Sequence, residues 1–412
     1  MKKHLQNLAL FICSLILIGF ICEGMFLWLN GFSSPPQIET FESMPNEERL
    51  DFFHYHPVYG YSGLPSIRKE FYRKYNANIS DRKYITHNSR GFRGPEVEYE
   101  KAKGVKRVAF IGDSQTWGWA VSDDETIAYY AGELLNRRSK NSSTYEPLNF
   151  GATGYGVDQS YLRFIAEGLR YQPDYVVFTY FAENDIDETS ATESWGVEKP
   201  YMYEKEGGGF CVSNVPPRRA SGWPSDNLAF IVENKFNIKN FKFKIGGLKF
   251  DLTDTQTVKY FKNRSINTTL FGGWGSDNSN AFSAIRKHVG CLEDEPGPPP
   301  LSWQDKINLV VKLIHLIHKT VTESGAEFFV VTKPHEDDYK RNRRGDDYLS
   351  VLTQLQRKSI NLIDMYSVAK AKNMAAERLF IAYGHLSPAG NKLVAESVVE
   401  KILETGAAGT SL

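Results

Sequence analysis

The chain has 412 residues, of which 41% are hydrophobic, and its 49 basic and 49 acidic residues give a formal net charge of zero. A chain of this length can bury a full core and exceeds one typical domain. Balanced charge gives no sign of a polyanionic partner, so we expect a globular protein that binds no nucleic acid.

The chain opens with a nearly continuous apolar run from Leu8 to Leu29. At about 1.5 Å per residue, this run spans the ~30 Å hydrocarbon core of a bilayer. Lys2 and Lys3 precede it and acidic residues follow it. The positive-inside rule therefore predicts a single-pass membrane anchor within residues 1–32, with a cytoplasmic N-terminus and a periplasmic or otherwise extracytoplasmic remainder. A cleaved signal peptide is the alternative.

Residues 33–104 are predicted to form a tether and an N-terminal extension. The tether is the Pro-, Ser- and Glu-rich stretch 33–46. Residues 54–98 are rich in aromatic side chains and turn signals, which indicate short strands or hairpins packed at the edge of the main domain.

From residue 105 onward, short apolar runs alternate with amphipathic patterns of helical period. Such alternation predicts a parallel sheet with right-handed crossovers, hence an α/β fold of three α/β/α layers built from residues 105–186 and 301–412. The predicted strands are 105–112, 148–151, 173–181, 327–332 and 360–364. The predicted helices are 124–138, 158–170, 302–324, one starting at 348, and 388–404, and Asp123 or Asp124 is expected to cap the first.

The alternation fails between residues 187 and 300, a stretch rich in Gly, Asn and aromatic residues. It is too long for a structureless loop, so we predict an inserted subdomain. The subdomain either acts as a lid or substrate-binding wall, or only elaborates the packing. Cys211 and Cys291 lie in it, and in an oxidising compartment such an isolated pair predicts a disulfide.

Ser114 follows the first strand of the α/β pattern, in the stretch VAFIGDSQTW. Ligands of open α/β sheets bind at the carboxyl ends of strands, so a serine there is a candidate nucleophile. The alternative is a serine that only caps the next helix. Three further stretches bear on the choice: NFGATGYG at 149–156, AEND at 182–185 and GHLSPAGN at 384–391.

In this order and spacing, the four stretches resemble the conserved blocks of the SGNH, or GDSL, hydrolase family. THNSRGFRGPE at 86–96 and YGVDQSYLRF at 155–164 are similar to a membrane-anchored bacterial branch of it. The resemblance implies a flavodoxin-like, three-layer fold. The α/β-hydrolase elbow G-x-S-x-G is absent around Ser114, which favours the SGNH arrangement.

The resemblance also implies a role for each block. Ser114 would be the nucleophile and His385 the general base and acid. The oxyanion hole would comprise the backbone N–H groups of Ser114 and Gly154 and the side-chain amide of Asn184. This chemistry requires no cofactor and no metal, and His315 and His318, which share a helix face among Leu and Ile, are interpreted as packing residues.

Two positions depart from the family pattern. The third block opens with Ala182 instead of Gly, which is a small change. The Asp usually found three residues before the histidine is Ala382 here. Three outcomes stay open: a backbone carbonyl orients His385 in a catalytic dyad, another carboxylate such as Asp364 or Asp185 replaces the Asp, or the site binds ligand without catalysis.

The resemblance, together with the predicted anchor, implies a membrane-anchored serine esterase that cleaves acyl esters through an acyl-Ser114 intermediate. It also suggests O-acetyl groups on extracytoplasmic polysaccharide as the substrate. One alternative is an O-acyltransferase that passes the acyl group to a sugar hydroxyl. The other is a non-catalytic glycan-binding or assembly protein, which Ala382 would favour.

Overall fold

A computed structural model describes residues 52–75, 78–139, 144–194, 197–217, 242–245, 248–251, 278–293, 301–358 and 360–408. The chain divides into two compact units, residues 1–39 with 221–274, and residues 40–220 with 275–412. The predicted anchor at 8–29 lies outside the described residues. Within them, no helix combines the length and apolar character needed to span a bilayer.

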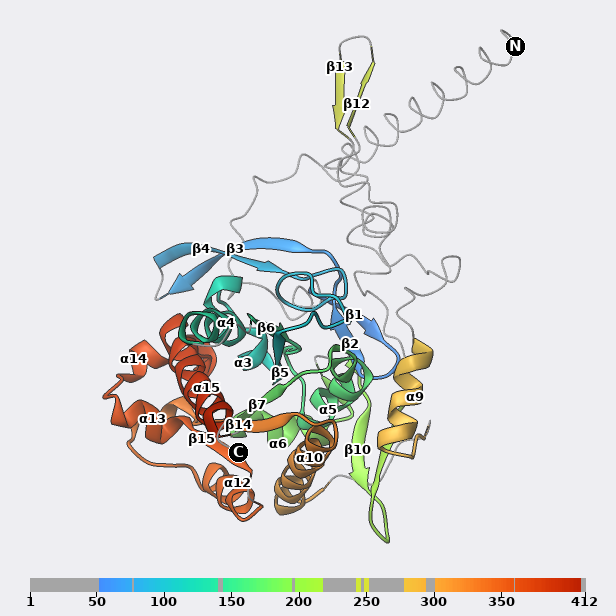
Figure 1. Cartoon of the computed structure of the whole chain (residues 1–412), viewed down its shortest axis with the longest axis vertical. Coiled ribbons are helices and arrows are strands. Elements are labelled where there is room, and N and C mark those ends of the chain that lie inside the picture. The colour runs from blue at the N-terminus through green and yellow to red at the C-terminus, as the bar shows by residue number, and fades with distance from the viewer. Residues whose placement is uncertain are drawn as a thin grey trace, which may run out of the picture. The chain divides into compact units, whose positions relative to one another are not determined.

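The larger unit is built on a five-stranded sheet in the order β15-β14-β7-β5-β6 (Figure 1). Every neighbouring pair in it is parallel, as the alternating pattern predicts. The central strand β7 is buried along its whole length, because helices cover both faces of the sheet. The strands are β5 (Val105–Gly112), β6 (Thr144–Asn149), β7 (Tyr175–Phe181), β14 (Glu327–Lys333) and β15 (Asn361–Asp364).

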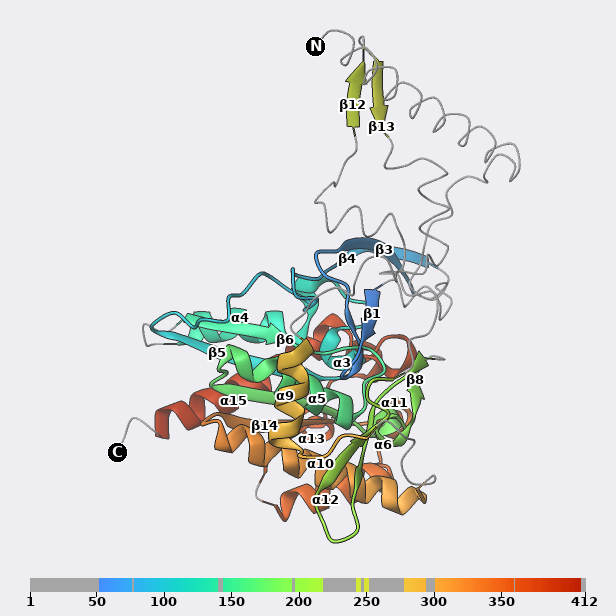
Figure 2. The ribbon, with the colours of Figure 1, turned by 90° about the vertical axis from the view of Figure 1, so that its right-hand side faces the viewer.

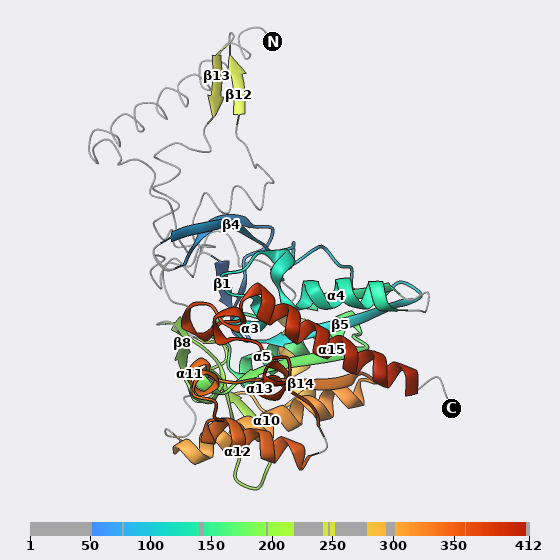
Figure 3. The same cartoon turned by 90° about the vertical axis from the view of Figure 1, so that its left-hand side faces the viewer.

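Side chains alternate between the two faces of these strands. Val108, Val177 and Val331 belong to one core cluster that also contains residues of the helices on that side. Figures 1 and 3 show α15 crossing this face, where it packs on α4. The helices of this layer are α4 (Ile127–Arg138), α13 (Met365–Ala371), α14 (Ala376–Leu379) and α15 (Pro388–Ala408).

The opposite layer holds the remaining long helices. The longest of them, α10, packs on α5, α6, α12 and β14. Its Ser302 side chain caps the helix by accepting a hydrogen bond from the Asp305 N–H. The helices of this layer are α5 (Val157–Ala166), α6 (Ala182–Ser190), α10 (Trp303–Glu323) and α12 (Asp346–Gln356).

Several element boundaries differ from the sequence prediction; for example, the helix predicted over 158–170 ends at Ala166. Strand β6 begins at Thr144 and includes Pro147, which an edge strand tolerates because it need not donate to a second neighbour. Helix α4 is capped by Thr126 rather than by Asp123 or Asp124. Asp123 instead accepts a hydrogen bond from the buried Arg93 at 2.8 Å, so the predicted cap was wrong.

The N-terminal extension contains two antiparallel hairpins, in the region where short strands or hairpins are predicted. One pairs β1 (Phe53–His56) with β2 (Gly60–Gly63), and the other pairs β3 (Arg68–Tyr75) with β4 (Asn78–Thr86). The Tyr61 hydroxyl donates to the Thr153 carbonyl at 2.8 Å. The extension therefore holds the loop that leaves β6.

The described parts of the insertion in the larger unit are tied to the α/β domain. Lys199 and Asp158 form an ion pair at 3.3 Å with both side chains fully buried. Cys211 and Cys291 are joined by a disulfide, as predicted, with their Cα atoms 4.6 Å apart. Figure 2 shows α9 beside α5, on which it packs. These elements are β8 (Glu193–Ser194), β9 (Val197–Glu198), β10 (Tyr201–Glu204), β11 (Phe210–Ser213) and α9 (Asn278–His288).

The smaller unit contributes one described element. It is an antiparallel hairpin of β12 (Lys242–Ile245) and β13 (Leu248–Asp251).

Candidate active site

Ser114 follows the carboxyl end of β5 and is the first residue of the short helix α3 (Ser114–Trp117). The turn into α3 requires glycine at 112, where φ is +147° and an added Cβ would lie 2.4 Å from the Thr116 Oγ1. Asp113 caps α3, because its carboxylate accepts a hydrogen bond from the Gln115 N–H at 2.9 Å. Ser114 is therefore not the cap, and its hydroxyl points elsewhere.

The Ser114 hydroxyl meets the imidazole of His385. The Oγ and Nε2 atoms lie 2.8 Å apart, although the residues are 271 positions apart in the sequence. His385 lies in the loop between α14 and α15, where the Ile381 N–H donates to the His385 carbonyl at 2.7 Å. A serine hydroxyl and an imidazole nitrogen at this distance have the geometry of a nucleophile and its general base.

Gln115 fixes the loop of His385 against α3. Its side-chain Oε1 accepts a hydrogen bond from the Leu386 N–H at 3.2 Å, and the side chain is buried. This bond joins the residue after Ser114 to the residue after His385. Sequence analysis did not single out Gln115, and only its position within the first block could have suggested it.

Two aromatic side chains flank the imidazole. The ring of Trp119 stacks on that of His385, with centroids 4.4 Å apart and planes 24° apart. The ring of Tyr383 then meets Trp119 edge to face, at 5.8 Å and 82°. Trp119 is buried, whereas Tyr383 is 69% exposed and has a φ of +57°. Neither residue was identified as part of the site from the sequence.

Gly154 lies in the loop that follows β6, and its φ of +72° favours glycine there. Its carbonyl accepts a hydrogen bond from the Ser194 hydroxyl of β8 at 3.3 Å. The loop also contains Gly151, where an added Cβ would lie 2.3 Å from the Trp117 N atom. The second block thus packs directly against α3.

Asn149, the first residue of that block, has a structural role. Its side-chain amide donates to the Thr116 carbonyl at 2.9 Å, and its Oδ1 accepts from the Gly151 N–H at 3.0 Å. Asn149 therefore holds the loop of Gly154 at a fixed position beside Ser114.

Asn184 lies in the first turn of α6, immediately after β7. Its side-chain Nδ2 donates to the Asp113 Oδ2 at 3.0 Å and to the Glu188 Oε2 at 2.9 Å, while its Oδ1 is buried without a partner. The amide therefore reaches the first block, next to Ser114. To serve an oxyanion, Asn184 must release one of these two carboxylates.

The carboxylates around Asn184 lie in a poorly solvated part of the site. Burial raises the pKa of Asp113 and, with the Asp113 charge, raises that of Asp185 well above its ordinary value. Burial, together with the same charge, raises the pKa of Glu188 to about 8. Like charges near one another disfavour joint ionisation, and Glu188 therefore retains its proton near neutral pH.

Neither carboxylate considered as a substitute for the missing Asp serves His385. Asp364 pairs with Arg344 at 2.6 Å and accepts from the Ser367 hydroxyl at 2.7 Å. Asp185 accepts from the Phe181 N–H at 2.6 Å. Asp364 thus stabilises the start of α13, and Asp185 the start of α6, rather than the imidazole of His385.

The THNSRGFRGPE stretch supports the turn after Ser114. The buried guanidinium of Arg93 donates to the Trp117 carbonyl at 2.9 Å and also to that of Gly118. The Trp117 indole N–H donates to the Nε2 of His87 at 3.1 Å. Burial and the charge of Arg93 lower the pKa of His87 to about 3, so this imidazole stays neutral and accepts that bond.

The one group among the described residues with suitable metal-ligand atoms close together is Cys211, Cys291 and Glu293, whose two sulfur atoms form the disulfide. His315 and His318 contact each other edge to face on α10, and His318 stacks on Phe328, whereas His315 is exposed to solvent.

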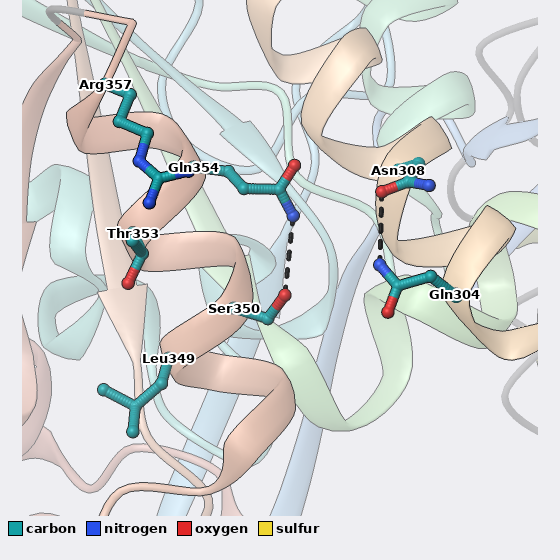
Figure 4. A pocket seen from close by; sticks show the side chains of 7 residues that line it. All are labelled: Gln304, Asn308, Leu349, Ser350, Thr353, Gln354 and Arg357. Carbon is teal, nitrogen blue, oxygen red and sulfur yellow. Dashed lines mark hydrogen bonds between the residues drawn. The ribbon is translucent and has the colours of Figure 1, made fainter.

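A hollow between α10 and α12 is separate from the candidate site. Figure 4 shows that polar side chains line it, with Gln354 donating to Ser350 at 3.4 Å and Gln304 donating to Asn308 at 3.2 Å. It has no nucleophile paired with a base, and we assign it no catalytic role. Its lining residues are Gln304, Asn308, Leu349, Ser350, Thr353, Gln354 and Arg357.

The chain matches no protein-family model and no curated protein sequence. Solved structures with some similarity include a two-domain esterase active on acetylated mannans, at 10% identity and a TM-score of 0.36, with 73% of this chain and 49% of that chain covered. A lipase/acylhydrolase from Enterococcus faecalis has 13% identity and a TM-score of 0.36, and the match covers 72% of this chain and 95% of that one. An acetylxylan esterase from Geobacillus stearothermophilus has 11% identity and a TM-score of 0.35, and the match covers 72% of this chain and 94% of that one. Similarity at this level carries no argument about activity, which we base on the side chains of the site.

Proposed function

We propose that this chain is a serine esterase of the SGNH type. The observation that carries the proposal is the 2.8 Å contact between the Ser114 Oγ and the His385 Nε2 at the carboxyl end of a parallel sheet. Ser114 is 7% exposed, so its hydroxyl is largely shielded from bulk water yet reachable. A serine that only capped a helix would not make this contact.

The arrangement supports a two-step acyl transfer. His385 Nε2 takes the proton of Ser114 as Oγ bonds to the ester carbonyl carbon, and a tetrahedral oxyanion forms. The bond to the alcohol oxygen then breaks, and His385 returns its proton to that oxygen. In the second step His385 takes a proton from water, whose oxygen attacks the acyl-serine, and the acid leaves as Ser114 regains its proton.

The oxyanion would be held by the N–H groups of Ser114 and Gly154 and by the amide of Asn184. The three residues follow the adjacent strands β5, β6 and β7, so their loops converge at one edge of the sheet. Asn184 would exchange its bond to Asp113 or Glu188 for one to the oxyanion. Loss of such a donor typically costs about 10²- to 10³-fold in rate.

His385 works in a dyad in this proposal. Stacking on Trp119 and the bond from the Ile381 N–H to the His385 carbonyl restrict the ring and its backbone. This is how the site would function with Ala382 in place of an aspartate. A protein that only binds glycans would not need the 2.8 Å contact between the Ser114 Oγ and the His385 Nε2.

For the substrate, we propose an O-acetyl ester on an extracytoplasmic polysaccharide. The block resemblance supports an ester, and the apolar run at 8–29 supports a membrane-anchored protein with the site outside the cytoplasm. The disulfide between Cys211 and Cys291 agrees with an oxidising compartment. An O-acyltransferase would use the same residues and differ only in whether a sugar hydroxyl or water reaches the acyl-serine.

The experiment is hydrolysis of an aryl acetate together with fluorophosphonate labelling of the full chain. Wild type should be labelled at Ser114 and turn over, whereas Ser114→Ala and His385→Ala should lose both by at least about 10³-fold. Labelling without turnover, restored by an added oligosaccharide acceptor, would instead indicate the transferase. Equal rates for wild type and both folded variants would contradict a catalytic Ser114.

A further inference from the structure

The loop of His385 carries an aromatic residue that the dyad does not use. The segment 381–385 is closed by the hydrogen bond from the Ile381 N–H to the His385 carbonyl, and Tyr383 is at its tip. Phe380 and Leu386 form a β-bridge just outside that bond. The loop that positions the base therefore also fixes the position of Tyr383.

Tyr383 has features that packing alone does not explain. Its ring is 69% exposed, the highest value among the exposed large hydrophobic residues of the described chain, which also include Tyr129, Trp303 and Leu349. Its φ is +57° and ψ is +34°, a left-handed conformation that costs a non-glycine residue about 1–2 kcal/mol. An exposed tyrosine recovers little of this cost by burial, and such strain clusters at functional sites.

The ring is also connected to the reacting atoms through one other aromatic side chain. Tyr383 meets the edge of Trp119, and Trp119 stacks on His385, whose Nε2 faces Ser114. The three rings form a row that runs from the dyad to the protein surface. Tyr129 and Trp303, by contrast, lie on α4 and α10, and the ring of Tyr129 contacts that of Tyr130.

We propose that Tyr383 forms a sugar-stacking subsite that binds a pyranose ring of the acylated chain. This inference rests on the proposed esterase function and names the part of the substrate that the site recognises. When an ester carbonyl carbon reaches Ser114, one oxygen atom separates it from the sugar carbon. The esterified ring or its neighbour in the chain then lies at the surface beside His385.

The chemistry of the ring fits this ligand. The face of an aromatic ring carries partial negative charge, and the C–H groups on the face of a pyranose present weakly positive hydrogens. The tyrosine hydroxyl remains in water and can bond to sugar hydroxyls. Trp119 holds the ring edge to face, so little side-chain freedom is lost when the sugar binds.

Binding is measured without turnover, by calorimetry with the full chain carrying Ser114→Ala. The probe is an O-acetylated β-1,4-xylooligosaccharide. Adding Tyr383→Asn, which tolerates the left-handed backbone but lacks the ring, should weaken binding about three- to tenfold. Tyr383→Trp should restore it, and Tyr129→Asn on α4 is the matched control.

The result expected is a loss confined to Tyr383→Asn. Undetectable binding of the probe, or equal affinity with and without the Tyr383 ring, would overturn the subsite. Hydrolysis of aryl acetate by chains with an intact Ser114 is assayed separately. A ring-dependent affinity in a protein that hydrolyses no ester would reject the esterase and leave a glycan-binding site at Tyr383.

Discussion

The imidazole of His385 lies against the indole of Trp119, with ring centroids 4.4 Å apart and planes inclined by 24°. Neither Asp364 nor Asp185 orients this histidine, because Asp364 accepts a hydrogen bond from Arg344 and Asp185 accepts one from the Phe181 N–H. In the proposed dyad, the stacked indole would restrict the orientation of the imidazole.

Replacement of Trp119 by Leu should lower kcat for aryl acetate by about ten- to a hundredfold, because a base displaced by about 1 Å can cost that much. Trp119→Phe keeps a flat ring and should recover most of the activity. Trp303→Leu, an exposed tryptophan on α10, is the control. If Trp119→Leu and Trp119→Phe lose activity equally, stacking is not what orients His385.

Asp364→Asn should leave kcat within about twofold of wild type, because its carboxylate serves Arg344 and Ser367 rather than His385. The same change should lower the free energy of unfolding by about 1–3 kcal/mol, since it weakens charge-assisted bonds. Kinetics and urea denaturation of one preparation test both statements. A large loss of kcat with unchanged stability would make Asp364 part of the catalytic machinery.

Glu188→Gln should change how stability depends on pH. Unfolded Glu188 loses its proton near pH 4.5, whereas the folded protein keeps it up to a pKa of about 8. Between these values the folded state binds more protons, so raising the pH favours unfolding. The variant should therefore gain stability relative to wild type as pH rises through this window, by at least about 1 kcal/mol at pH 9.

Urea midpoints at pH 5, 7 and 9 measure this gain. Glu133→Gln, on the exposed face of α4, provides the control for removal of a carboxylate. A constant difference between Glu188→Gln and wild type at all three values would show that Glu188 ionises alike in both states.

Removal of the disulfide by Cys211→Ala with Cys291→Ala should lower the free energy of unfolding by about 2–4 kcal/mol, because the bond closes a loop of 80 residues in the unfolded chain. Dithiothreitol should bring wild type to the stability of the double variant and leave that variant unchanged. Thiol titration of denatured, non-reduced wild type should find at most two of the four cysteines. Four free thiols would exclude the bond.

Much of the sheet was predictable because its strands are short apolar runs between turn residues. The strand at β7 was the strongest signal, and it is buried throughout. The pairing of Ser114 with His385 followed from the order of the four blocks, and the structure brings their side chains to 2.8 Å.

The rest depends on contacts that sequence spacing does not encode. Trp119 follows α3 in a stretch with other aromatic residues, and its contact with His385 joins residues that are 266 positions apart in the sequence. Asn184 was expected to face an oxyanion, but its side chain also bonds to Glu188 one turn along α6 and to Asp113, and the Asp113 bond depends on how α6 lies against α3. Likewise, Thr126 caps α4 instead of Asp123, whose carboxylate accepts a hydrogen bond from Arg93.

The 271 residues that separate Ser114 from His385 have a consequence for biosynthesis. The sheet strands β5, β6, β7, β14 and β15 all leave the ribosome before the histidine does, and α15 must still dock on α4. A nascent chain therefore carries the nucleophile long before it has the base. In the proposed esterase, hydrolytic competence would arise only after His385 and α15 have been synthesised, so a chain that still lacks them could not attack esters.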